Sequence, residues 1–229
     1  MAEFPLFHDR HDAGHQLAQA VLAELASLGR IQASAQPIVY ALPKGGLPIA
    51  EPLAQLLHCP LDVVVAKKVT RPENPELAIG AVTADGHVIR SRQECFMQLD
   101  NGTWRSALQQ AQTKAQEQLT QFESVRPQVK PQGAIAILVD DGIATGMTMA
   151  VAARALRAKR PARILICAPV APKHMVQSLE HWGDRVIILA SPESFFSVSR
   201  FYGEFHQVEM EEALECMKRG NQADPTLKS

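Results

Sequence analysis

Residues 137–148 read Ile-Leu-Val-Asp-Asp-Gly-Ile-Ala-Thr-Gly-Met-Thr. An apolar run ends here in two adjacent carboxylates, Asp140 and Asp141, and a short loop then leads into a helical pattern. Carboxylates accept hydrogen bonds from sugar hydroxyls, and backbone amides at a helix N-terminus bind phosphate. Glycines at positions 142 and 146 let the backbone close around an anion because they carry no Cβ. The stretch therefore predicts a strand, loop and helix that bind a sugar together with its phosphate.

Composition narrows the class of protein. The chain has 229 residues, of which 46% are hydrophobic, and this length suits one domain with elaborations. Its 23 basic and 24 acidic residues give a net charge of −1, so we expect no nucleic-acid or membrane partner, and any polyanion site must be local. Cysteines 59, 95, 167 and 216 form no paired motif and are expected to be reduced thiols. Without a secretory or membrane-spanning pattern, we expect a cytoplasmic protein.

Apolar strand patterns alternate with amphipathic helical patterns along the chain. Strands are expected at residues 37–42, 61–66, 134–139, 163–170 and 186–190, and helices at 10–29, 47–57, 103–125, 147–159 and 173–181. Continuously apolar strands that alternate with helices are typical of a parallel sheet covered on both faces. We therefore predict an α/β fold with a central parallel sheet flanked by helices. Its ligands should bind outside the carboxyl ends of the strands.

Two segments extend this core. Residues 69–86 contain Pro72, Pro75 and the turn Asp85-Gly86, which predicts a mobile loop followed by a β-hairpin. We assign a β-rich and helical insertion to about 69–130 and a small hood to about 191–219, with a contribution from the N-terminus. The whole chain, 1–229, is then one domain, ending in a frayed tail from Gly220.

Two common phosphate-binding motifs are absent from the sequence. There is no G-x-x-x-x-G-K-[ST] string, so Asp140 and Asp141 do not accompany a Walker A loop. Neither Gly45-Gly46 nor the loop 142–146 fits the G-x-G-x-x-G pattern of dinucleotide sites.

The segment from Val139 to Thr148 resembles the phosphoribosyl-pyrophosphate (PRPP) loop of type I phosphoribosyltransferases and matches that pattern completely. Residues 43–46, Pro-Lys-Gly-Gly, resemble the pyrophosphate loop of the same family. Three further segments are similar to a bacterial branch usually described only as predicted phosphoribosyltransferases. They are Phe7-x-Asp9-Arg10-x3-Gly14, Pro75-Glu76-Leu77-Ala78-Ile79-Gly80-Ala81-Val82 and Phe201-Tyr202-x2-Phe205-x-Gln207-Val208.

The resemblance implies a role for each matching residue. Asp140 and Asp141 would hold the ribose hydroxyls and, indirectly through PRPP and water, the Mg²⁺ cofactor; with Lys44 they would be the catalytic residues. The 5′-phosphate would bind to Gly142, Ile143, Ala144, Thr145, Gly146, Met147 and Thr148. The pyrophosphate would meet Pro43, Lys44, Gly45, Gly46, Lys67 and Lys68, the two last at the end of the second core strand. The loop from Val69 to about Glu76 would close over the substrate.

The resemblance favours Mg²⁺-dependent transfer of the phosphoribosyl group from PRPP to a nitrogenous, nucleobase-like acceptor. Because positive charge builds on the ribose and negative charge on the leaving pyrophosphate, such catalysis depends on positioning and electrostatics. A non-catalytic PRPP or nucleotide sensor is the alternative from another class, and hydrolysis of a phosphorylated sugar is a third. The acceptor is not identified, and the oligomeric state stays open, with a homodimer as the common case.

Several side chains have two interpretations from the sequence. His8, His11 and His15 share a helical spacing that suits either a metal site or a solvated surface, and we favour the surface. The hood contains a group of aromatic residues that either pack a subdomain or dimer contact or stack on a base. The group comprises Phe195, Phe196, Phe201, Tyr202 and Phe205.

Overall fold

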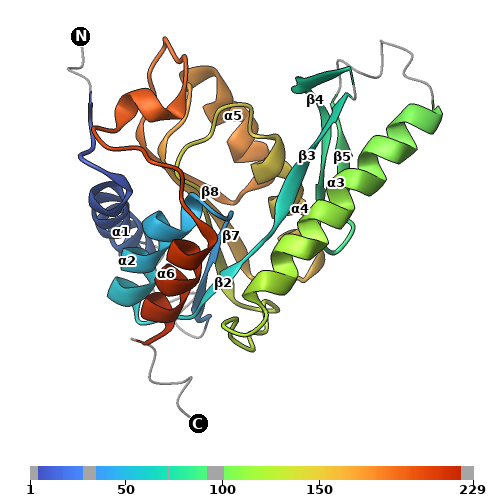
Figure 1. Ribbon diagram of the computed structural model, residues 1–229. Helices are drawn as coiled ribbons and strands as arrows, with labels where there is room; N and C mark the ends of the chain where they lie inside the picture. The colour runs from blue at the N-terminus through green and yellow to red at the C-terminus, as the bar shows by residue number, and fades with distance from the viewer. Residues whose placement is uncertain (1–4, 28–34, 72, 92–100, 223–229) are drawn as a thin grey trace.

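A central sheet of five parallel strands forms the core of the computed structural model, which describes residues 5–27, 35–71, 73–91 and 101–222 (Figure 1). In spatial order the strands are β2 (Leu61–Val63), β1 (Pro37–Ala41), β6 (Ile135–Val139), β7 (Arg163–Val170) and β8 (Arg185–Ala190). Every neighbouring pair is parallel. The predicted α/β class and parallel sheet are therefore confirmed.

Helices cover both faces of this sheet. The first face carries α1 (Arg10–Ser27), α2 (Gly46–Leu57) and α6 (Met210–Gln222), and the second carries α4 (Met147–Ala158) and α5 (Lys173–Trp182). Successive side chains of a strand point to opposite faces of the sheet. Val39 and Ala41 therefore pack in the hydrophobic cluster on the first face, whereas Ile38 and Tyr40 pack in the cluster on the second face. This two-sided burial explains why the strands are apolar without interruption.

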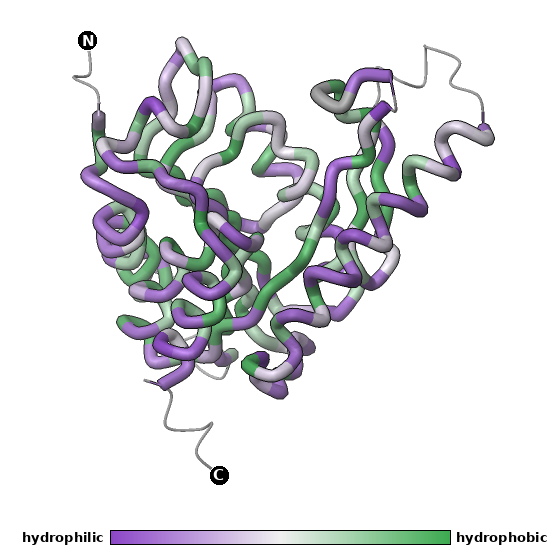
Figure 2. Tube along the Cα trace, in the orientation of Figure 1, coloured by the Kyte–Doolittle hydropathy of each residue, from purple (hydrophilic) through white to green (hydrophobic). Residues whose placement is uncertain are grey.

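A second, three-stranded antiparallel sheet stands beside the core (Figure 1). It contains β3 (Ala66–Arg71), β4 (Asn74–Thr83) and β5 (Val88–Arg90), and α3 (Asn101–Phe122) packs on it. Figure 2 shows that much of α3 is hydrophilic. The α3 helix buries three alanines, whose small side chains allow close packing, together with two large aromatic side chains and one glutamine: Ala107, Ala111, Ala115, Trp104, Phe122 and Gln118. The larger apolar side chains of Leu108 and Leu119 on this helix are only half-buried.

Three sequence-based expectations were wrong in detail. The mobile loop predicted after Val69 is mostly strand, since β3 and β4 pair as a hairpin. Lys67 and Lys68 lie on β3 rather than at the end of a core strand, because β2 already ends at Val63. Gly220, expected in a frayed tail, belongs to α6 and packs against Leu61. The expected helix end at Gly29 lies outside the described residues.

The chain order places a switch point between β1 and β6. From β1 the chain passes to β2 on one side, while β6 pairs with β1 on the other side. In open α/β sheets, ligands bind at the carboxyl ends of strands where such a reversal occurs. The loops after β1 and β6 are therefore the first place to look for a site.

Among the described residues, no helix has the length and hydropathy needed to cross a membrane.

Candidate functional site

The loops after β1 and β6 touch at the switch point. The Leu42 amide donates to the Val139 carbonyl at 2.9 Å, and the Pro43–Lys44 peptide is cis. A Cβ on Gly45 would overlap the Asp141 carboxylate, and one on Gly46 would lie 2.9 Å from the Val139 carbonyl. The two glycines thus allow a close approach of the loops. The structure brings the predicted pyrophosphate loop against the predicted ribose carboxylates.

A small cavity of about 200 Å³ lies over the loop that follows β6. It is lined by Lys68, Asp140, Gly142, Ile143, Ala144, Thr145, Gly146, Thr148 and Met149. Gly146 directly precedes α4, and its backbone is in the left-handed region with φ of 69°. As a glycine it has no side chain that could cap the helix. The first-turn amides of a helix have no partner within the helix, so they can donate to a phosphate here. The Ile143 amide, in contrast, already donates to the Val170 carbonyl at 2.9 Å.

Asp140 and Asp141 carry perturbed carboxyl groups. Burial raises the pKa of Asp140 well above its usual range, and the neighbouring Asp141 charge raises it further. Burial also raises the pKa of Asp141, although the Arg10 guanidinium opposes this increase. The Arg10 Nε donates to Asp141 Oδ2 at 2.8 Å. The Asp141 charge thus disfavours a second charge on Asp140, while Arg10 favours the charged form of Asp141.

Arg10 was not predicted as a site residue, although it stands in one of the quoted segments near the N-terminus. Its side chain is almost buried, and its guanidinium carbon lies 3.7 Å from the centre of the Phe205 ring. Its Nη1 donates to the His206 carbonyl at 2.7 Å. Tyr202 was also missed as a site residue, and its hydroxyl donates to the Asp141 carbonyl at 2.6 Å. These contacts hold Asp141 in place from α1 and from the C-terminal segment.

Three lysines surround the two loops. Lys44 Nζ lies 3.5 Å from an oxygen of the exposed Glu209 side chain. Lys68 lines the small cavity, whereas Lys67 does not line it. Burial lowers the pKa of Lys67, and the charges of Lys44 and Lys114 lower it further. The proximity of Lys44 and Lys67 concentrates positive charge on a protein with almost no net charge.

The N-terminal and C-terminal segments pair above the site. The amides of Leu6 and Phe7 donate to the Phe201 carbonyl at 2.9 and 3.0 Å. Phe201 and Tyr202 are buried, with Phe201 stacked on Phe195. Packing therefore accounts for most of the aromatic group. Phe196, in contrast, is 80% exposed, and the Arg200 guanidinium carbon lies 5.1 Å from the centre of its ring.

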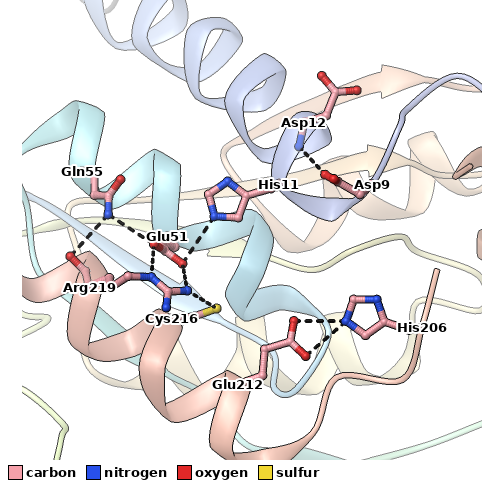
Figure 3. Close-up of polar contacts among 9 residues, drawn as sticks. All are labelled: Asp9, His11, Asp12, Glu51, Gln55, His206, Glu212, Cys216 and Arg219. Atoms are coloured by element: carbon pink, nitrogen blue, oxygen red, sulfur yellow. Dashed lines mark hydrogen bonds and ion pairs between the residues drawn. The ribbon is translucent and has the colours of Figure 1, made fainter. Parts of the chain in front are cut away.

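A buried carboxylate on α2 is in contact with side chains of two other helices (Figure 3). Glu51 of α2 accepts hydrogen bonds from Arg219 of α6 at 2.7 and 2.9 Å. The Nε2 atom of His11, on α1, lies 3.6 Å from Glu51 Oε2. Burial acts to raise the pKa of Glu51, but the His11, Arg219 and Cys216 hydrogen bonds outweigh it and lower the pKa to about 2. His11 thus pairs with a carboxylate. Within the described part of the chain, no three His, Cys, Asp or Glu side chains cluster as metal ligands.

Asp140 and Asp141 suit a Mg²⁺ ion whose other ligands come from the substrate and water, rather than an ion that is held by protein side chains alone. Mg²⁺ in proteins is usually held by one or two carboxylates together with substrate phosphates and water. Asp140 lines the small cavity, and Lys68 in the same wall suits an anionic substrate that would supply the other oxygens.

Comparisons with known proteins agree with this geometry. A family model described as the phosphoribosyl transferase domain matches residues 13–199. A protein of Mycobacterium tuberculosis H37Rv named "Putative phosphoribosyl transferase Rv0571c" is 35% identical over 217 residues, which cover 94% of this chain and 47% of the relative. A protein of strain CDC 1551, with the same descriptive name and the designation MT0597, matches to the same extent. The chain therefore spans about half the length of these curated relatives.

A solved structure extends the match to the whole fold. The crystal structure of TT1426 from Thermus thermophilus has a TM-score of 0.75 and 32% identity, covering 93% of this chain and 97% of the other. The parallel sheet, the switch-point loops and these matches together show that the chain belongs to the phosphoribosyl transferase domain family and has its type I fold.

Proposed function

We propose that this protein transfers the phosphoribosyl group of PRPP to a nitrogenous, nucleobase-like acceptor and releases pyrophosphate, with Mg²⁺ as cofactor. The observation that carries the proposal is the contact between two loops at the switch point. One loop offers Asp140, Asp141 and the amides that begin α4, and the other offers Lys44 and two glycines. Family membership agrees with such a reaction and leaves the acceptor open.

The proposed reaction exchanges one bond at the anomeric carbon of PRPP. The bond from this carbon to the pyrophosphate oxygen breaks, a bond to an acceptor nitrogen forms, and an acceptor nitrogen that carried a hydrogen releases it as a proton to solvent. Positive charge then develops on the ribose, which the carboxylates of Asp140 and Asp141 stabilise. Lys44, Lys67 and Lys68 stabilise the negative charge of the leaving group. The 5′-phosphate is held by residues 144–148, so the ribose is oriented before reaction.

Mg²⁺ would bind through Asp140, Asp141 and the substrate oxygens and would neutralise part of the pyrophosphate charge. The charged forms of both carboxyl groups are needed for this role. Arg10 supports the charge of Asp141 by its direct ion pair.

Calorimetric titration with PRPP and Mg²⁺ tests the donor site. We expect the intact protein to bind PRPP and the Asp140→Asn/Asp141→Asn variant to lose at least about tenfold in affinity, because charged hydrogen bonds contribute roughly 1.5–3 kcal/mol each. Glu215→Gln, which changes an exposed carboxylate on α6, is the matched control. Equal affinity in the intact and double-variant proteins would overturn the proposal.

Turnover is measured separately as pyrophosphate release with a panel of nucleobases. Release that depends on one base would identify the acceptor. Tight PRPP binding without release for any base would instead support the sensor alternative.

A further inference from the structure

A second cavity of about 910 Å³ lies on the outer side of α4, between β5 and α5. Its size falls within the range that encloses small organic ligands, roughly 300–1,000 Å³. It is lined by Ile89, Arg90, Ser91, Thr145, Met147, Ala150, Ala153, Arg154, Arg157, Ala158, Ser178, His181 and Trp182. The proposed transfer reaction uses only the edge of this space, at Thr145 and Met147.

The charged side chains of this cavity have one sign. Arg90, Arg154 and Arg157 line it, and no Asp or Glu is among the described residues of its wall. Arg154 Nη1 donates to the Val88 carbonyl at 3.2 Å, and Arg157 Nη1 donates to Asp184 at 2.9 Å. A guanidinium has five N–H donors, so these bonds leave each arginine with donors for a further acceptor. Three guanidinium groups around one cavity suit a phosphate-bearing ligand.

Part of the remaining wall is apolar and suits a flat ring, while Ser91, Thr145, Ser178 and His181 add polar groups to it. Ala150 and Ala153 lie one helical turn apart on α4, and their small side chains leave the space open. Ile89 and the indole of Trp182 contribute larger apolar surfaces to the same wall. An aromatic base can stack on such surfaces while its phosphate meets the arginines.

We propose that this cavity is a second ligand site that binds a nucleoside phosphate, separate from the proposed PRPP site. Its position also links it to the 5′-phosphate loop. Thr145 lines both cavities, and a Cβ on Gly146 would lie 2.9 Å from the Trp182 ring. A nucleotide in the second cavity therefore contacts the loop that begins α4, and any effect that it has on PRPP affinity is matched by an equal effect of PRPP on nucleotide affinity.

Titration of the full chain with AMP, GMP and UMP, followed by calorimetry and by tryptophan fluorescence, tests this site. The chain has two tryptophans; Trp182 lines the cavity and Trp104 lies beneath Arg90, with 4.0 Å between the guanidinium carbon and the ring centre. We expect a nucleotide to change the fluorescence and to bind more tightly than inorganic phosphate. Equal binding of phosphate and nucleotide, or no binding at millimolar concentration, would overturn the proposal.

Variants locate the binding. We expect Arg154→Gln/Arg157→Gln to weaken nucleotide binding by at least about tenfold, whereas Asp140→Asn/Asp141→Asn binds normally. Arg185→Gln is the matched control, because Arg185 forms a similar exposed ion pair, with Glu24, away from the cavity. Loss of binding in the aspartate variant alone would place the nucleotide in the PRPP site and refute the second site.

Ala158→Trp provides a second route if the arginine variant folds poorly. Ala158 is exposed at the cavity wall, so an indole there fills the space without entering the core. We expect calorimetry to show nucleotide binding reduced by at least about tenfold, and unchanged binding would contradict the proposal. These measurements need no PRPP, so they remain decisive even if PRPP fails to bind.

Discussion

At the scale of single residues, Gly45 sets how closely the two loops approach. Its φ of −61° and ψ of −29° are open to any residue, so its role is steric. Because an added Cβ would overlap the Asp141 carboxylate, we expect Gly45→Ala to cost roughly 1–3 kcal/mol of unfolding free energy and to weaken PRPP binding. Urea unfolding measures the first effect and calorimetry the second.

A double-mutant cycle tests whether the cost of Gly45→Ala comes from overlap with the Asp141 carboxylate or from a contact elsewhere. In an Asp141→Ala background, the stability cost of Gly45→Ala should largely disappear, because the carboxylate is gone. Gly102→Ala, at an exposed position of α3, should not lower stability. A cost that persists unchanged in the Asp141→Ala protein would show that another contact excludes the Cβ.

Arg10 acts at the same scale through charge. Its guanidinium lowers the pKa of Asp141 against the effect of burial. Arg10→Met therefore raises the pKa of Asp141, and the carboxyl keeps its proton to higher pH. We expect the pH midpoint of PRPP binding to move upward in Arg10→Met and to stay in place in Arg185→Gln. A pH profile that only loses amplitude would assign Arg10 a structural role alone.

At the scale of elements, Glu51 joins α2 to α6 and α1 (Figure 3). Its folded pKa of about 2 is below the usual 4.5, so its contribution is fully present above pH 4.5 and is lost as pH falls toward 2. We expect Glu51→Gln to lower the unfolding free energy at pH 7 by roughly 1.5–3 kcal/mol, and by much less below pH 3. Urea unfolding across pH measures this.

The control for Glu51 is Glu215→Gln, which breaks an exposed pair with Lys218. Exposed pairs contribute roughly 0–1 kcal/mol, so this variant should change stability little at either pH. A Glu51→Gln cost that is independent of pH would mean that shape, and not charge, makes the contribution.

At the scale of the whole molecule, the proposed substrate should stabilise the fold, because only the native arrangement brings both loops together. PRPP with Mg²⁺ at about one hundred times its Kd adds about 2.7 kcal/mol, which raises Tm by roughly 5–10 °C for a chain of this size. Differential scanning calorimetry measures the shift. We expect EDTA to reduce it, and the same shift in Asp140→Asn/Asp141→Asn would contradict the proposed site.

Much of the core followed from local pattern. The strand predicted at residues 163–170 is β7, and the predicted helix at 147–159 ends one residue earlier as α4. Buried strands and their loops have periodicities and turn residues that are visible over a few positions. The β3–β4 hairpin was missed because two prolines indicated a loop, whereas pairing with a neighbouring strand decides the structure.

The alternation of apolar strands with helices along the chain was enough to predict the α/β class, and Asp140, Asp141 and residues 142–148 group together because they are adjacent in the chain. The groups that complete the candidate site from distant parts of the chain come together through folding. Arg10 lies 131 residues from the Asp141 carboxylate that it contacts, and Tyr202 lies 61 residues from the carbonyl that it bonds. Such contacts depend on strand order and helix packing, and no local pattern specifies either.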